Sequence, residues 1–86
     1  MNIEQRHITT LEHHRDHAPE NLDEQGLQIV GEDQRLSTEI LTLVDSVNSG
    51  SITEEEFRTQ LSAVLESSTI VSMAKTTGTY ILESLG

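Results

Sequence analysis

The clearest hydrophobic pattern lies between residues 33 and 48. Apolar side chains recur there every three or four residues, at Leu36, Ile40, Leu43, Val44 and Val47. This spacing places them on one face of a helix, and polar residues fill most of the positions between them. The pattern predicts an amphipathic helix over residues 33–48.

A second stripe follows a short polar stretch and consists of Phe57, Leu61, Val64 and Leu65. It predicts a helix over residues 53–67. No segment alternates apolar and polar residues in the way a half-buried strand does. We therefore predict an all-α fold of three or four short helices, built on the hairpin of these two helices.

Residues 69–85 predict a further helix with apolar residues on more than one face, namely Ile70, Val71, Met73, Ala74, Tyr80, Ile81 and Leu85. Gly78 lies inside this helix and costs about 1 kcal/mol relative to alanine. We interpret the apolar spread as a helix that packs against two neighbours, one of them in a second subunit. The chain is therefore expected to form a homo-oligomer.

The N-terminal part predicts a short helix over residues 3–17 that ends before Pro19, because the residue preceding a proline avoids the helical conformation. Pro19 is then interpreted as the first residue of another helical segment. Gly26 and Gly31 favour a break or bend before the 33–48 helix.

The length of 86 residues fits one small helical domain over residues 1–86. Within it, residues 1–18 are interpreted as an N-terminal helix that is separate from the rest or flexible.

The stretch DSVNSGSITEEEF, residues 45–57, resembles the calcium loop of an EF-hand. Asp45 would take its first position and Glu56 its twelfth. The third position, however, is Val47, whose side chain cannot bind a cation. We interpret the loop as a degenerate one.

Helix caps explain the same stretch. Gly50 suits the left-handed conformation just past a helix end. Ile52 and Phe57 have the spacing of a hydrophobic staple, and Thr53 and Glu56 that of a capping box. We prefer this interpretation, in which the stretch joins two helices.

His13 and His17 are four residues apart and share one face of the predicted N-terminal helix. Two imidazoles at this spacing can bind zinc or copper, but a third ligand would require distortion. We favour a solvated helix here and keep a weak metal site as the alternative.

The charge balance restricts the partners. Fifteen acidic residues against five Lys and Arg give a formal net charge of −10, which repels nucleic acids and anionic membranes. We expect no direct binding of nucleic acid or membrane, and a protein partner with a basic surface instead. Mimicry of DNA by the carboxylates is an alternative, but we favour a generic solvated surface over it.

Other classes of function lack their sequence signatures. The chain has no cysteine, no apolar run long enough to cross a membrane and no nucleophile-elbow, P-loop or dinucleotide-binding motif. We therefore expect a cytoplasmic protein that is not an enzyme and needs no cofactor.

Two short segments, QIVGEDQRL (residues 28–36) and SMAKTTGTYIL (residues 72–82), resemble small helical phage proteins that sequester cyclic oligonucleotides and so blunt the CBASS defence of bacteria. The resemblance implies a helical hairpin that assembles into a homo-oligomer with pockets between subunits. It also implies Lys75 and Thr76 as ligand-binding residues, and symmetry could bring Arg35 from several subunits into the same pocket to bind the phosphates. The pocket aromatic and lysine that the family carries near its N-terminal half have no counterpart here.

From these patterns we expect a small acidic helical protein that acts by protein–protein interaction, as an inhibitor or an adaptor. A phage-type sponge for cyclic oligonucleotides is the first alternative. A metal-binding module, based on the EF-hand-like loop or on the histidines, is the second.

Overall fold

The computed structural model describes residues 3–17 and 19–85, and within these ranges it contains four α-helices and no strand. The helices are α1 (Gln5–Asp16), α2 (Glu24–Asn48), α3 (Glu54–Glu66) and α4 (Met73–Ser84). The predicted all-α fold is confirmed. None of these helices combines the length and apolar character needed to span a bilayer.

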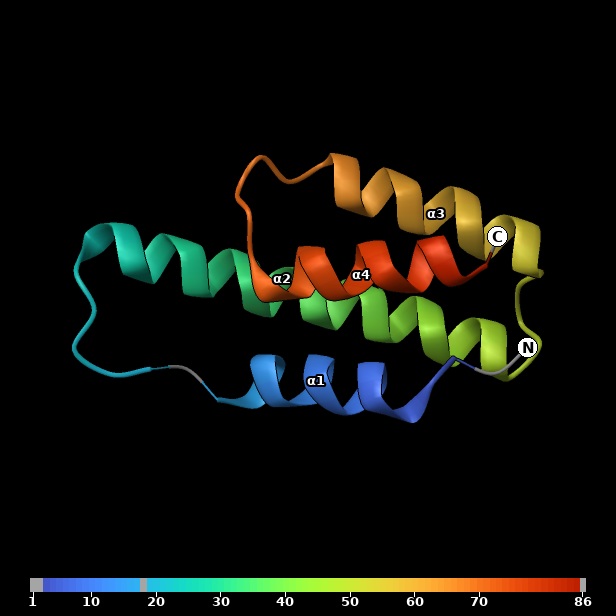
Figure 1. The fold of residues 1–86 in the computed structure, drawn as a ribbon, viewed down its shortest axis with the longest axis horizontal. Coiled ribbons are helices and arrows are strands. Elements are labelled where there is room, and N and C mark those ends of the chain that lie inside the picture. The colour runs from blue at the N-terminus through green and yellow to red at the C-terminus, as the bar shows by residue number, and fades with distance from the viewer. Residues whose placement is uncertain (1–2, 18, 86) are drawn as a thin grey trace.

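The four helices form an antiparallel bundle in which each helix runs opposite to the one before it (Figure 1). α2 contacts the other three helices, and α4 does as well. α1 and α3 do not contact each other, so they lie on opposite sides of the α2–α4 pair. α2 and α4 therefore form the centre of the bundle.

The core is built from the apolar stripes that the sequence predicts. The residues with no exposed surface include Phe57, Leu11, Leu36, Ile40, Leu61 and Ile81. Val44 and Val47 are nearly as buried and complete the α2 stripe. Leu11 brings α1 into the same cluster, so all four helices share one core.

α2 begins earlier than the predicted helix over residues 33–48. Its N-cap is Asp23, whose Oδ1 accepts a hydrogen bond from the Gly26 N–H at 2.8 Å. The helix continues through Gly26 and Gly31 without interruption, so the expected break is wrong, and so is the helix start at Pro19. A glycine costs only about 1 kcal/mol in a helix, which a strong cap and a well-packed continuation can offset.

α4 begins later than expected. Ser72 is its N-cap, with its Oγ accepting the Lys75 N–H at 3.2 Å. Ile70 and Val71 precede this cap and belong to the connection from α3, so their assignment to the helix is wrong. The serine hydroxyl sets the start because it satisfies a backbone donor of the first turn.

Gly78 marks the closest approach of α4 to its neighbours. It is buried, and a Cβ atom at this position would lie 2.7 Å from Leu65 Cδ2 and 2.9 Å from Ile40 Cδ1. Side chains of α2 and α3 thus pack directly against the α4 backbone. The glycine that weakens α4 as an isolated helix is what allows this packing.

Two alanine substitutions test the close packing. Gly31→Ala should raise the free energy of unfolding by about 1 kcal/mol, because alanine is the better helix former and the new methyl group meets no atom within 4 Å. Gly78→Ala gains the same propensity but overpacks the core, which typically costs about 1–3 kcal/mol. We expect Gly78→Ala to be at least about 1 kcal/mol less stable than Gly31→Ala in urea unfolding. Equal stabilisation by both would contradict the close approach.

Candidate interaction surface

A buried carboxylate joins three of the helices. Asp33 of α2 is 9% exposed, and its Oδ1 accepts the Ala74 N–H at the start of α4 at 2.7 Å. Its Oδ2 lies 2.8 Å from Nδ1 of His14, in the last turn of α1. The first turn of α4 has no acidic residue of its own, so Asp33 supplies the negative charge that a helix N-terminus favours.

The connection between α2 and α3 has the geometry of two caps. Gly50 has φ +83°, and its N–H donates to the Val47 carbonyl at 3.3 Å. The Ser51 N–H donates to the Ser46 carbonyl at 2.9 Å, which completes a Schellman motif.

The start of α3 carries both hydrogen bonds of a capping box. The Thr53 Oγ1 accepts the Glu56 N–H, and the Glu56 carboxylate accepts the Thr53 N–H, each at 3.1 Å. Phe57 is fully buried, and Ile52 is partly buried against the core. These contacts hold α3 at a defined angle to α2.

The EF-hand-like residues do not form a calcium loop. Asp45 lies inside α2, where its carbonyl accepts the Ser49 N–H, and Val47 is buried in the core. The Glu56 carboxylate is bonded to the Thr53 backbone. Across residues 3–17 and 19–85, no three His, Asp or Glu side chains gather in a group that could hold a metal ion.

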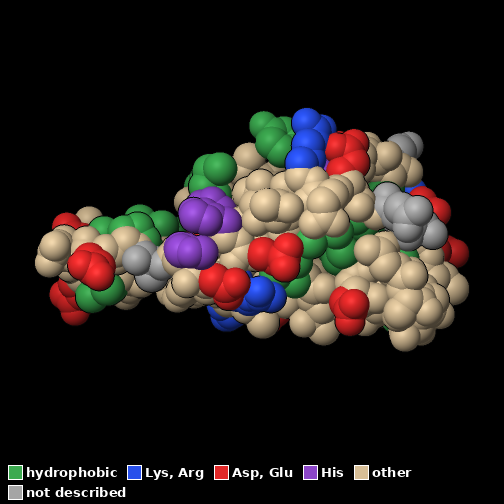
Figure 2. Space-filling model, turned by 90° about the horizontal axis from the view of Figure 1, so that it is seen from below, with side chains coloured by type: hydrophobic (Ala, Val, Ile, Leu, Met, Phe, Trp, Pro, Cys, Tyr) green, Lys and Arg blue, Asp and Glu red, His purple; other side chains and the backbone are tan. Residues whose placement is uncertain are grey.

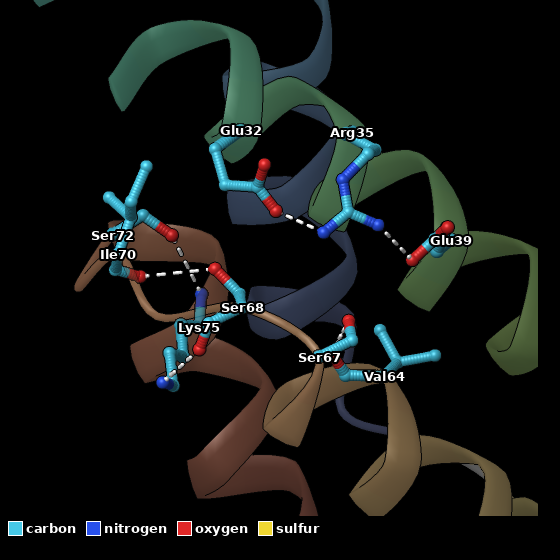
Figure 3. A network of polar contacts seen from close by, with 9 residues as sticks. All are labelled: Glu32, Arg35, Glu39, Val64, Ser67, Ser68, Ile70, Ser72 and Lys75. Carbon is cyan, nitrogen blue, oxygen red and sulfur yellow. Dashed lines mark hydrogen bonds and ion pairs between the residues drawn. The ribbon is translucent and has the colours of Figure 1, made fainter. Parts of the chain in front are cut away.

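The residues implied by the phage-protein resemblance are bonded within the chain, and Figure 3 shows two of them, Arg35 and Lys75, with their partners. Arg35 pairs with Glu32 and, at 3.1 Å, with Glu39. The Lys75 Nζ donates to the Ser68 carbonyl at 2.7 Å. The Thr76 hydroxyl donates to the Ser72 carbonyl at 3.1 Å.

The pKa values report how strongly Arg35 is engaged. Its hydrogen bond lowers the pKa of the Glu32 carboxyl, and the same bond raises the pKa of Arg35. An anionic ligand would have to displace two carboxylates from this guanidinium. Sequestration of a cyclic oligonucleotide therefore stays a prediction from the resemblance.

The N-terminal end of α2 extends beyond its neighbours (Figure 1). His14 of α1 and Ala74 of α4 both meet Asp33, so the residues before this level have no helix beside them. We call residues 24–31 the arm. Its eight residues span about 12 Å.

The arm exposes apolar side chains. Leu27 is 60% exposed and Ile29 is 45% exposed, and only Gly26 and Val30 of the arm are partly covered. Ile29 lies one helical turn before Asp33, on the face that turns toward the start of α4. Ile29 thus continues the core face of α2 into solvent, whereas Leu27, two residues before it, lies on nearly the opposite side of the helix.

Acidic side chains surround the arm. Glu20, Asp23, Glu24 and Glu32 lie within or next to it, whereas no Lys or Arg occurs between Arg15 and Arg35. On the face shown in Figure 2, the narrow end of the molecule carries acidic and hydrophobic side chains and no basic ones. The arm therefore exposes two apolar side chains, on different sides of the helix, in a negative field.

A second group of exposed apolar residues lies on α4. Met73 and Tyr80 are 53% and 57% exposed and line a groove of about 660 Å³ between α1 and α4. Arg6 and His7 of α1 and Glu83 of α4 line the same groove, so it carries both signs of charge.

Neither the arm nor Asp33 was singled out from the sequence. The sequence feature that could have indicated a buried Asp33 is its register with the apolar stripe. It lies three residues before Leu36 and seven before Ile40. The signal for the arm was Leu27 and Ile29 upstream of that stripe. Comparison with protein families, with curated proteins and with solved structures finds no match to this chain.

Loss of the Asp33 carboxylate should destabilise the fold. We expect Asp33→Ala to lower the free energy of unfolding by about 2–3 kcal/mol, because it leaves the Ala74 N–H buried without an acceptor. Asp33→Asn should lose less, since its amide oxygen can still accept that bond. The exposed Asp45 provides the control, and Asp45→Ala should change stability by less than about 0.5 kcal/mol. Urea unfolding gives all three values. Equal losses for Asp33→Ala and Asp45→Ala would show that the network contributes nothing.

Proposed function

We propose that this protein acts by protein–protein interaction and that the arm docks into an apolar groove rimmed by Lys and Arg on its partner. The observation that supports this is the combination of exposed Leu27 and Ile29 with four carboxylates in or beside the arm, of which only Glu32 is paired with an arginine. An inhibitor or an adaptor would work in this way. A cytoplasmic location, the lack of a cofactor and the lack of enzymatic activity stay predictions from the sequence.

The apolar side chains of the arm provide affinity. Burial of a Leu or Ile side chain contributes about 1.5–3 kcal/mol. A helix seated in an apolar groove is a recurrent mode of recognition, and the groove must enclose the arm to bury both side chains, because Leu27 and Ile29 lie on nearly opposite sides of the helix. The arm is preformed as the first turns of a long, capped helix, so little ordering is required when it binds.

The carboxylates of the arm provide selectivity and speed. They attract a cationic surface at long range and accelerate its association, and salt screens this effect. Two arms of the same protein would bring eight carboxylates together, because each arm has four in or beside it. Charge therefore favours a basic partner over a second copy at this surface.

The proposal is tested by capture from a lysate of the source cell at low and high salt. The arm variant combines Leu27→Gln and Ile29→Gln, which keep a good helix former at each position. It should weaken the complex at least about a hundredfold, since the two side chains together contribute about 3 kcal/mol. A partner supports the proposal if high salt weakens its capture and if the purified pair reproduces both effects.

Val71→Gln is the matched control, because it removes an exposed apolar side chain that lies outside both the arm and the groove between α1 and α4. It should bind the partner as the unchanged protein does. Capture that is insensitive to the arm variant, or to salt, would contradict the proposal.

Self-association is proposed at a different surface, the groove between α1 and α4. Met73 and Tyr80 lie seven residues apart on α4 and both line this groove. Because the groove carries charges of both signs, two copies related by a two-fold axis can meet there without a uniform repulsion.

Light scattering over a wide range of protein concentration tests this contact. We expect a dimer or larger assembly that Tyr80→Gln shifts to the monomer and that the arm variant leaves intact. A monomer at every concentration, or an assembly that only the arm variant disrupts, would show that the groove is not the contact.

A further inference from the structure

Two histidines at the end of α1 lie against each other in an exposed position. His13 and His17 are both exposed, and their rings are stacked with centroids 4.4 Å apart and an interplanar angle of 16°. They lie on the same helical face because they are four residues apart. In Figure 2 histidine side chains are visible where the narrow end meets the body of the molecule.

The hydrogen bond of His17 determines which nitrogen is available. Its Nδ1 lies 3.2 Å from the backbone carbonyl oxygen of His13. A carbonyl oxygen only accepts hydrogen bonds, so this Nδ1 carries the proton, and in the neutral ring Nε2 has a free lone pair. Metal-binding histidines commonly donate their second ring N–H to a backbone carbonyl in this way.

The electrostatic setting favours a cation. The two rings lie at the C-terminal end of α1, where the helix dipole is negative. Arg15, the nearest arginine in the sequence, is paired with the Asp16 carboxylate at 2.8 Å. The chain as a whole carries a formal charge of −10.

We infer that His13 and His17 form a two-ligand site for a transition-metal ion of the copper(II) type. No third His, Asp or Glu joins them among the described residues, so water fills the other coordination positions. His14 is directed to Asp33 instead. Copper(II) is the favoured ion because it stands highest among divalent first-row metals in affinity for nitrogen ligands and accepts a tetragonal arrangement.

The rings must leave their stacked arrangement to bind one ion, because the nitrogen lone pairs lie in the ring planes and do not converge while the rings are nearly parallel. Metal–imidazole bonds are about 2 Å long, so the two Nε2 atoms must approach more closely than the present ring separation. Both side chains are exposed and can rotate without disturbing the core. The inference is independent of the proposed docking of the arm.

Titration of the tag-free protein with copper(II) tests the site. Calorimetry measures the affinity and the number of ions bound, and electron paramagnetic resonance identifies the ligands. We expect one ion per chain and a spectrum with two imidazole nitrogens. His13→Gln and His17→Gln should each weaken binding by more than about tenfold, since loss of an outer-shell partner alone costs about that much. His7→Gln should leave the affinity unchanged.

Two results would overturn the inference. One is a copper affinity that neither His13→Gln nor His17→Gln lowers, which would place the ion on carboxylates or the chain terminus. The other is a spectrum with a single imidazole nitrogen in the unchanged protein.

Discussion

The position of Asp33 determines the architecture of the bundle. One carboxylate pairs with His14 in the last turn of α1 and accepts the Ala74 N–H in the first turn of α4. A buried charge is costly unless it is hydrogen-bonded, and both oxygens of this group are bonded. α1 therefore ends, and α4 begins, at the same level of α2. Everything on α2 before that level extends into solvent, so the interaction that closes the bundle also creates the arm.

Packing at Gly78 is the second constraint. It lets Leu65 and Ile40 approach the α4 backbone, which draws α2, α3 and α4 together. The arm is not drawn in with these helices, because it lies outside the Gly78 contact. The overall extents of 40 × 22 × 19 Å and the radius of gyration of 12.9 Å reflect this shape. A compact chain of this length would have a radius of about 12 Å.

Local features could be predicted from the sequence, and features that depend on distant residues could not. The caps at Gly50 and Thr53 involve residues within one turn, and their spacing alone indicates them. The break expected at Gly26 and Gly31 does not occur, because helix propensity is a weak constraint. The Asp23 cap and the packing of the rest of α2 override it. Asp33 meets Ala74 across 41 residues of sequence, and no local pattern indicates that pairing. The exposure of Leu27 and Ile29 was equally inaccessible, since it depends on where α1 ends and α4 begins.

The few cations of the chain explain why its surface is so strongly negative. Each of the five Lys and Arg side chains has a partner within the chain, and these partners are Glu4, Asp16, Glu32 with Glu39, the Leu85 carbonyl with Glu54, and the Ser68 carbonyl. Exposed pairs of this kind contribute little to stability, typically below about 1 kcal/mol. These pairs affect the electrostatic field of the surface more than they affect stability, because they confine the positive charge to short local contacts. Around the arm, Glu20, Asp23 and Glu24 are exposed and have no Lys or Arg near them in the sequence, and only Glu32 is paired, with Arg35. A partner that approaches the arm thus meets a negative field that only its own Lys and Arg can neutralise.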